Sequence, residues 1–177
     1  PQLTYTLEVV RETGTTLSSP FVLPIIPVPQ TKDSIDAWAG VLNMIYALRD
    51  KNLTNFSLTT AVGTGDPDRL TTSGTYAGNR TGTTDRAFNS LGYIYTGLAY
   101  APDLSNLAMV RVGASTALPI DSKRPDALRV GSDFFFYNKL DLGSPTSGVS
   151  GNSHWIGFEM DLRLDWRITS DISANVR

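Results

Sequence analysis

The feature that most constrains the fold is a regular alternation of thirteen residues from Ile156 to Ile168. Every second residue is large and apolar, and the residues between them are Gly157 or charged. Because successive side chains of a β-strand point to opposite faces, the segment predicts a strand with one apolar and one polar face. At roughly 3.3 Å per residue it spans about 43 Å, or about 33 Å at a tilt near 40°, which is enough to cross the hydrocarbon core of a bilayer. Strands of soluble domains usually stop after about five or six residues.

The composition removes most classes of enzyme. The chain has 177 residues, a net charge of −2, no cysteine and a single histidine, His154. It therefore lacks the groups for thiol catalysis, a cysteine zinc site, a histidine metal cluster or a histidine-based triad. The weak net charge indicates no nucleic-acid partner. We expect a protein without enzymatic activity, metal or cofactor.

Other segments repeat the alternation in a weaker form. The segment 127–139 has apolar residues on one face, although Phe135 and Tyr137 interrupt its polar face. The segment 14–34 contains four prolines, which disfavour both a helix and a central strand, so we expect a long loop there. Further strands are expected at residues 3–13, 56–62, 107–118 and 127–139, and from about residue 172.

Residues 35–49 fit two structures. Their apolar positions have helical spacing, and Asp33 or Ser34 could cap a helix, which is slightly favoured for the segment in isolation. As a strand, the same segment places Trp38 and Tyr46 near opposite ends of one face, as the aromatic belts of a membrane barrel require.

Loop lengths bear on the aromatic patch at 91–100. Outer-membrane barrels alternate short periplasmic turns with long extracellular loops, and this alternation holds only if the patch is not a strand. We therefore expect residues 64–106 to form one extracellular connection, large enough to fold back into a pore. The fold class predicted for residues 1–177 is all-β, a single region of an antiparallel transmembrane β-barrel with about seven strands. Closed bacterial barrels have at least eight, so we expect missing strands or further protein chains to complete the barrel or assembly.

The alternation divides the candidate functional residues between two faces. Charged side chains avoid lipid, since Arg or Lys at the bilayer midplane costs roughly 2 to 4 kcal/mol. These charged residues could take part in selecting solutes. Alternatively, they could form a salt-bridge network that only neutralises the charges of the lumen wall, with attraction between successive charged residues of 159–167. The predicted lumen residues are Arg111, Arg129, Asp133, Glu159, Asp161, Arg163, Asp165 and Arg167, and the predicted lipid-facing residues are Trp38, Tyr46, Phe134, Phe136, Leu162 and Trp166.

Three smaller motifs allow other chemistry. Glu159 and Asp161 could form the carboxylate pair of a glycosidase, but the alternation already explains both residues. Asp66 and Asp68 could bind calcium, although an Asx turn beside the intervening proline is favoured. The sequence Asn79-Arg80-Thr81 fits a glycosylation sequon, which would be coincidental on a bacterial surface.

Two stretches resemble a known family. Residues 88–119 begin with Phe-Asn and continue through an aromatic-Gly step and an Asn-Leu pair into a strand that ends at proline, and residues 155–162 follow the pattern WxGxExDL. Residues 64–66 supply a Thr-Gly-Asp that closes an earlier strand. Over residues 35–177 the chain resembles the alginate-export family of outer-membrane barrels. The resemblance implies passive passage of an anionic polysaccharide or another solute through an arginine-lined lumen.

The expected function is therefore that of a porin or exporter in the bacterial outer membrane, with membrane lipid and a small or polymeric, anionic sugar solute as partners. The mixed charge of the predicted lumen residues suits a general porin equally well. Two alternatives remain open, a secreted or cell-surface β-sandwich that binds a ligand or partner, and a structural module that assembles through open sheet edges.

Overall fold

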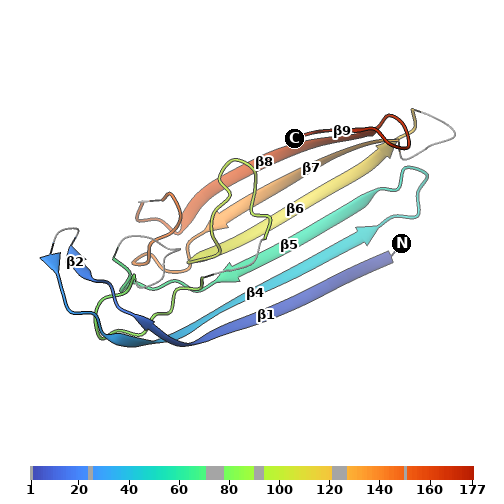
Figure 1. The fold of residues 1–177 in the computed structure, drawn as a ribbon. Helices are drawn as coiled ribbons and strands as arrows, with labels where there is room; N and C mark the ends of the chain where they lie inside the picture. The colour runs from blue at the N-terminus through green and yellow to red at the C-terminus, as the bar shows by residue number, and fades with distance from the viewer. Residues whose placement is uncertain (1, 24–25, 71–77, 90–93, 121–126, 150) are drawn as a thin grey trace.

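The computed structural model describes residues 2–23, 26–70, 78–89, 94–120, 127–149 and 151–177, and within those ranges it contains β-strands and no helix. Seven strands form one antiparallel sheet in the order of the chain (Figure 1). The expected all-β antiparallel sheet is thus confirmed. The strands are β1 (Gln2–Leu17), β4 (Lys32–Ala47), β5 (Asn55–Gly63), β6 (Leu107–Leu118), β7 (Leu128–Asn138), β8 (Trp155–Arg167) and β9 (Ser173–Val176).

The ambiguous segment 35–49 lies mostly in a strand. β4 pairs with β1 from Lys32 to Ala47, and its other edge pairs with β5. Pairing on both edges satisfies backbone groups that an isolated helix would satisfy internally, which explains why the helical spacing of the apolar residues did not decide the fold. The strand alternative is therefore correct here.

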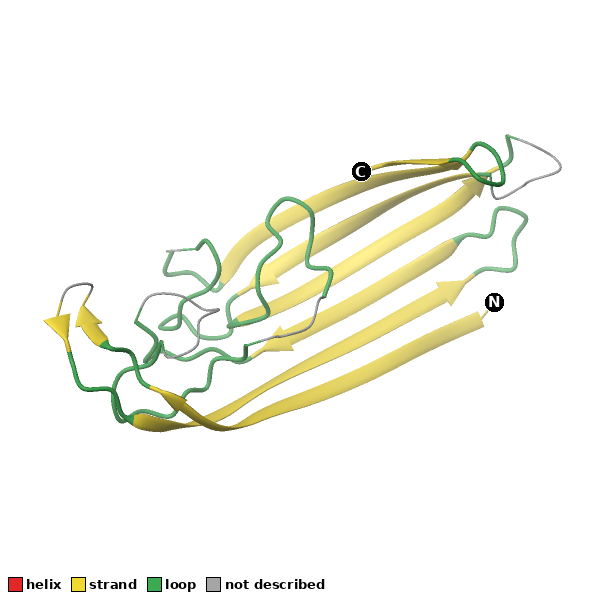
Figure 2. Ribbon diagram, viewed as in Figure 1, coloured by secondary structure: helices red, strands yellow, loops and turns green. Residues whose placement is uncertain are grey.

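The connections differ in length at the two ends of the sheet. Three short connections join strands at one end of the sheet, called the turn end below; they are residues 48–54, 119–127 and 168–172. Three longer connections join strands at the other end, called the loop end (Figure 2); they are residues 18–31, 64–106 and 139–154. The proline-rich connection is shorter than the expected 14–34, because β1 extends to Leu17. It contains a separate hairpin of β2 (Phe21–Leu23) and β3 (Ile26–Pro27). Within residues 94–100, the described part of the patch 91–100, no strand is present.

The sheet is not closed. Among the described strands, β1 and β9 each pair on one side only, and β9 covers just the last residues of β8, from Leu164 to Arg167. The rest of the outer edge of β8 and the whole outer edge of β1 therefore present unpaired backbone groups.

The two faces of the sheet have opposite surroundings. On the face called the apolar face below, large hydrophobic side chains are exposed, including Tyr5 (69%), Leu162 (61%) and Phe158 (70%). On the opposite polar face, Phe135 and Asp133 are fully buried. The buried hydrophobic side chains lie where the polar face meets the connection 64–106; they are Ala37, Ala39, Ala61, Phe88, Leu104, Leu107, Met109, Phe135 and Tyr137.

Small residues allow this connection to lie directly on the sheet. A Cβ at Gly63 would overlap the backbone of Leu104, and a Cβ at Gly65 would lie 2.5 Å from the Cβ of Asn106. Figure 1 shows part of the connection crossing in front of the strands. Residues 64–106 thus form one connection that covers part of the polar face.

Candidate functional site

The contact that holds residues 94–106 on the polar face centres on Glu159 of β8. One carboxylate oxygen accepts hydrogen bonds from the backbone N–H groups of Leu98 and Ala99, both at 2.7 Å. The other oxygen accepts one from the N–H of Tyr100 at 3.0 Å. Three successive amides thus converge on one carboxylate, a charge-assisted arrangement of the kind that fixes a loop. Segments 59 to 61 residues apart in the chain are joined at this point.

Tyr137 of β7 reinforces the same contact. Its hydroxyl lies 2.7 Å from the carbonyl oxygen of Thr96 and 3.1 Å from Glu159 Oε2, so its single proton can be donated to either oxygen. Gly97 lies directly over these groups with a φ of +122°, and a Cβ there would be 2.5 Å from the tyrosine hydroxyl. Only glycine fits this close approach without strain.

A second contact joins the segment to the sheet through Tyr95. Its hydroxyl donates to Asp161 Oδ2 at 2.6 Å. Its ring packs edge-on against Phe135 and lies 5.2 Å from the guanidinium carbon of Arg111, a cation–π distance. Tyr100 likewise packs edge-on against Tyr137. Phe135 and Tyr137, which interrupt the polar pattern of β7, are therefore the sheet side of an aromatic contact with the connection.

Three charged residues on neighbouring strands form a network beside this contact. Asp133 is fully buried, and Arg111 donates to its Oδ1 at 2.9 Å. Arg163 lies 3.6 Å from its Oδ2. Asp133 stands directly opposite Asp161 in the register, so the two guanidinium groups offset a like-charge pair. The expected attraction between successive charges of β8 is replaced by diagonal pairing across strands, because long arginine side chains reach a neighbouring strand.

Glycine again makes room for the network. A Cβ at Gly113 would overlap the Asp133 carboxylate and lie 2.5 Å from Ser57 Oγ. A Cβ at Gly131 would lie 3.2 Å from the Arg163 guanidinium. These glycines allow the charged side chains to lie flat along the sheet.

The remaining predicted lumen residues lie away from the covered region. Arg129 donates to Ser115 Oγ at 3.2 Å and to the carbonyl oxygen of Leu53 at 3.4 Å, near the turn end. With Asp165 and Arg167 it lines an open cavity of about 340 Å³ beside β9. The eight predicted lumen residues therefore share the polar face but fall into three groups: two that hold the connection, three in the buried network and three at the turn end.

The six residues predicted to face lipid lie together on the apolar face. The strand register places Tyr46 beside Phe56, Phe134 beside Met160 and Leu162 beside Ser132. Phe136 packs against Trp155, with ring centroids 6.5 Å apart. The exposed fractions of the six side chains run from 39% for Phe134 and Phe136 to 61% for Leu162, with Trp38, Tyr46 and Trp166 between these values.

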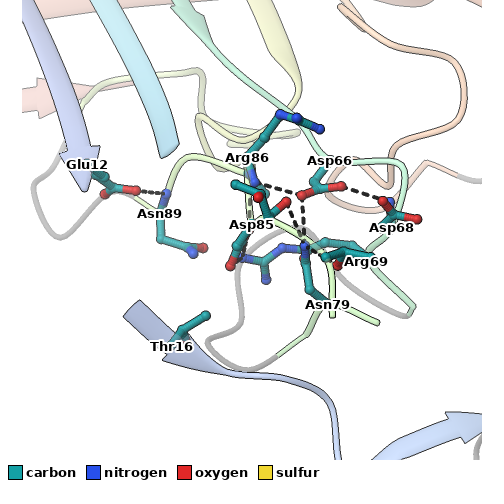
Figure 3. A network of polar contacts seen from close by, with 12 residues as sticks. Glu12, Thr16, Asp66, Asp68, Arg69, Asn79, Asp85, Arg86 and Asn89 are labelled. Carbon is teal, nitrogen blue, oxygen red and sulfur yellow. Dashed lines mark hydrogen bonds and ion pairs between the residues drawn. The ribbon is translucent and has the colours of Figure 1, made fainter. Parts of the chain in front are cut away.

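The loop end has a polar core of its own (Figure 3). Asp66 is fully buried; its Oδ1 accepts from the N–H of Asp68 at 2.8 Å, and its Oδ2 accepts from Asn79 and from the N–H of Arg86. The first of these bonds is the Asx turn favoured by the sequence. Asn79 is also fully buried, so its side chain is not accessible for glycosylation in this structure. Among the described residues, no group of three or more His, Asp or Glu side chains could hold a metal ion.

A buried ion pair lies beside this turn. Arg69 Nη2 is 3.0 Å from Asp85 Oδ2, and both side chains are almost completely buried. Burial raises the pKa of Asp85, and the adjacent guanidinium opposes that shift. Figure 3 also shows Glu12 of β1 accepting a hydrogen bond from the N–H of Asn89, which ties the connection to the first strand. The connection is therefore anchored at both sides of the sheet.

Sequence reasoning did not identify the residues of the connection that make these contacts. Tyr95, Tyr100 and Asn106 all lie in a segment expected to be irregular. Asn106 is fully buried and joins residues 141–146 to the connection through its amide, with Nδ2 donating to the carbonyl oxygens of Asp141 and Ser144. The sequence feature that could have indicated these contacts was the pair Phe135 and Tyr137, because two aromatic residues on a polar face need apolar side chains to cover them.

Within the described residues, no helix is long and apolar enough to span a membrane. No protein-family model matches the chain, and no curated protein is significantly similar to it.

Proposed function

We propose that this chain forms part of the wall of a bacterial outer-membrane β-barrel that passes solutes through a charged lumen. In this proposal the apolar face contacts lipid, the polar face lines the lumen, and residues 94–106 narrow it. The loop end is extracellular and the turn end is periplasmic, as in barrels with short periplasmic turns. The stretches that resemble alginate-export porins support the same assignment.

The observation that carries the proposal is the inverted burial of the two faces. Part of the charged face is covered by the connection 64–106, whereas Tyr5, Phe158 and Leu162 on the apolar face are each more than half exposed. In a soluble protein the apolar face of a sheet is buried and the charged face is exposed to water, because exposing a large apolar side chain instead of burying it costs about 1.5 to 3 kcal/mol. Lipid removes that cost.

The same observation argues against the β-sandwich. A sandwich buries the apolar face of one sheet under a second sheet about 10 Å away. Among the described residues, the only other sheet is the hairpin of β2 and β3, which is too short to cover seven strands. The sandwich would therefore leave unexplained why the connection covers the charged face.

Strand length and open edges also support a barrel. A membrane β-strand needs about 9 to 11 residues, and β4 to β8 contain between 9 and 16. Membrane strands must pair on both edges, because lipid offers no hydrogen-bonding groups. We infer that further antiparallel strands pair with the outer edge of β1 and with the part of the β8 edge that β9 leaves unpaired.

The contacts of the charged residues favour anionic solutes. Glu159 and Asp161 are occupied by the connection, and Asp133 is buried beneath Arg111 and Arg163. The two arginine side chains remain 18% and 28% exposed. Glu159 and Asp161 thus already accept hydrogen bonds from the connection, whereas both guanidinium groups keep donors beyond their contacts with Asp133, which suits small or polymeric anionic sugars.

A matched pair of adjacent variants tests the proposal. Leu162→Arg places a charge on the apolar face and should prevent insertion into bilayers, at a cost of about 2 to 4 kcal/mol. Arg163→Leu changes the neighbouring polar-face residue and should leave insertion intact while lowering anion preference. The measurements are heat-modifiable migration after refolding into detergent or lipid, and single-channel conductance with reversal potentials in a salt gradient.

The unmodified protein in its longest natural form provides the reference. Steady conductance with anion preference supports an exporter of anionic sugars, and conductance without preference supports a general porin. Solubility without detergent and no insertion would refute the barrel and favour a cell-surface module.

A further inference from the structure

A second polar site lies at the loop end, outside the polar face of the sheet. A cavity of about 500 Å³ is lined mainly by residues that follow β7, among them Lys139, Ser144, Thr146 and Asn152. Its volume falls within the range of about 300 to 1,000 Å³ that is common for small-molecule sites. The lining is largely polar and includes hydroxyl, amide and ammonium groups.

Lys139 gives this cavity its charge. The residue is only 5% exposed, and its Nζ donates to the carbonyl oxygen of Gly151 at 2.8 Å. An ammonium group has three donors, so two remain for other acceptors. No carboxylate in the described part of the chain forms an ion pair with it. A buried cation without a counter-charge is costly unless an anion or other acceptors complete its shell.

The neighbouring charges do not neutralise Lys139. Arg69 lines the same cavity but is paired with Asp85 at 3.0 Å, so this pair adds no net charge. The carboxylate of Asp141 carries a negative charge but forms no ion pair with Lys139, and it accepts a hydrogen bond from the N–H of Gly143 at 2.7 Å. The hydroxyl of Ser144, in the wall of the cavity, is buried and has no hydrogen-bond partner among the described residues. Within the described residues, the site therefore combines an ammonium group that forms no ion pair with a buried hydroxyl that forms no hydrogen bond.

We propose that this cavity binds a compact oxyanion, a carboxylate or phosphate group, against the ammonium of Lys139. Lysine acts as a point charge with several donors, which suits either group. The hydroxyls and amides of the wall would bind the remaining oxygens. This site lies in the connection 139–154 and does not depend on whether the chain conducts solutes.

The test is isothermal titration of the protein in detergent micelles with sodium phosphate and, separately, sodium acetate, at constant ionic strength with chloride as the balancing anion. Saturable binding of either oxyanion is expected. Lys139→Met should weaken it at least tenfold. Lys32→Met is the matched control, because it removes an exposed lysine at the same end of the sheet and should leave binding unchanged.

A second measurement needs no variant and covers the case in which Lys139→Met fails to fold. In the unmodified protein, the backbone amide resonances of Gly151 and Asn152 should shift saturably with the same oxyanion, and that of Lys32 should not. Tighter binding of phosphate than of acetate assigns a phosphate group, and the reverse order a carboxylate. No saturable binding above the chloride control, or equal weakening by both lysine variants, would overturn the proposal.

Discussion

Replacing Glu159 by glutamine should release the segment that covers the polar face. The variant keeps the size of the side chain but removes its charge, and its amide nitrogen brings a donor towards the N–H groups of residues 98–100. A hydrogen bond to a charged group contributes about 1.5 to 3 kcal/mol. Since glutamine retains one acceptor oxygen and the site is partly open to solvent, we expect a net loss of about 3 kcal/mol from the three bonds.

This free energy predicts the size of two effects. A change of about 3 kcal/mol shifts the equilibrium between attached and released segment by roughly a hundredfold. Amide hydrogen exchange at Leu98, Ala99 and Tyr100 should become faster by about that factor where exchange occurs through local release. If the segment narrows a lumen, single-channel conductance should rise and should show additional open levels.

Asp165→Asn is the matched control for this experiment. Asp165 lies on the same strand and face as Glu159, and the structure describes no side-chain hydrogen bond from it to the connection. Its substitution removes the same charge but should leave both exchange and open levels unchanged. Unchanged exchange at residues 98–100 in Glu159→Gln would refute the reasoning about the contact. Faster exchange with unchanged conductance would refute only the narrowing of a lumen.

Three further predictions concern individual contacts. Gly97→Ala should destabilise the covered state by about 2 kcal/mol or more, measured by denaturant unfolding, because the site combines a φ of +122° with a tyrosine hydroxyl 2.5 Å from the added Cβ. Asp85→Asn should cost about 3 to 5 kcal/mol by removing the carboxylate charge that pairs with the buried guanidinium of Arg69, and proteolysis at the loop end should detect it before the strand signal in circular dichroism changes. The hydroxyl of Thr54 lowers the pKa of Asp50, so Thr54→Val should raise that pKa towards its ordinary value in an NMR titration. The stability that this bond contributes is present above the unfolded pKa and is lost as the pH falls through the folded pKa, so the two proteins should converge in acid.

The alternation of side chains was sufficient to predict the strands and the division of residues between two faces. The segment 107–118 matches β6 in full, and the expected strand 156–168 differs from β8 by one residue at each end. Alternation works here because its period of two is a direct consequence of strand geometry. Alternation was insufficient for residues 35–49, where apolar residues occur both at the three- and four-residue spacing of a helix and at the two-residue spacing of a strand. The segment forms a strand because it has a partner strand on each side.

The site was less accessible to sequence reasoning, because its contacts join segments far apart in the chain. Glu159 and Tyr95 were separated by a connection without periodicity, so nothing local indicated that residues 94–100 would return to β7 and β8. The charged residues were predicted to share one face of the sheet, and they do, but the residues with which they form ion pairs were not predicted. Diagonal pairing of Arg111 and Arg163 with Asp133 depends on the register, which the sequence of one strand does not specify.

The departures from alternation nevertheless carried structural information. An apolar residue on a polar face needs a cover, and Phe135 and Tyr137 are each almost completely buried beneath aromatic residues of the connection. Acids beside such a pair are then close to backbone amides of the covering segment, and Glu159, opposite Phe135 in the register, occupies that position. The acids nearest the cover therefore hold it in place, and in the proposed barrel the half-buried Arg111 and Arg163, rather than these acids, would face a passing solute.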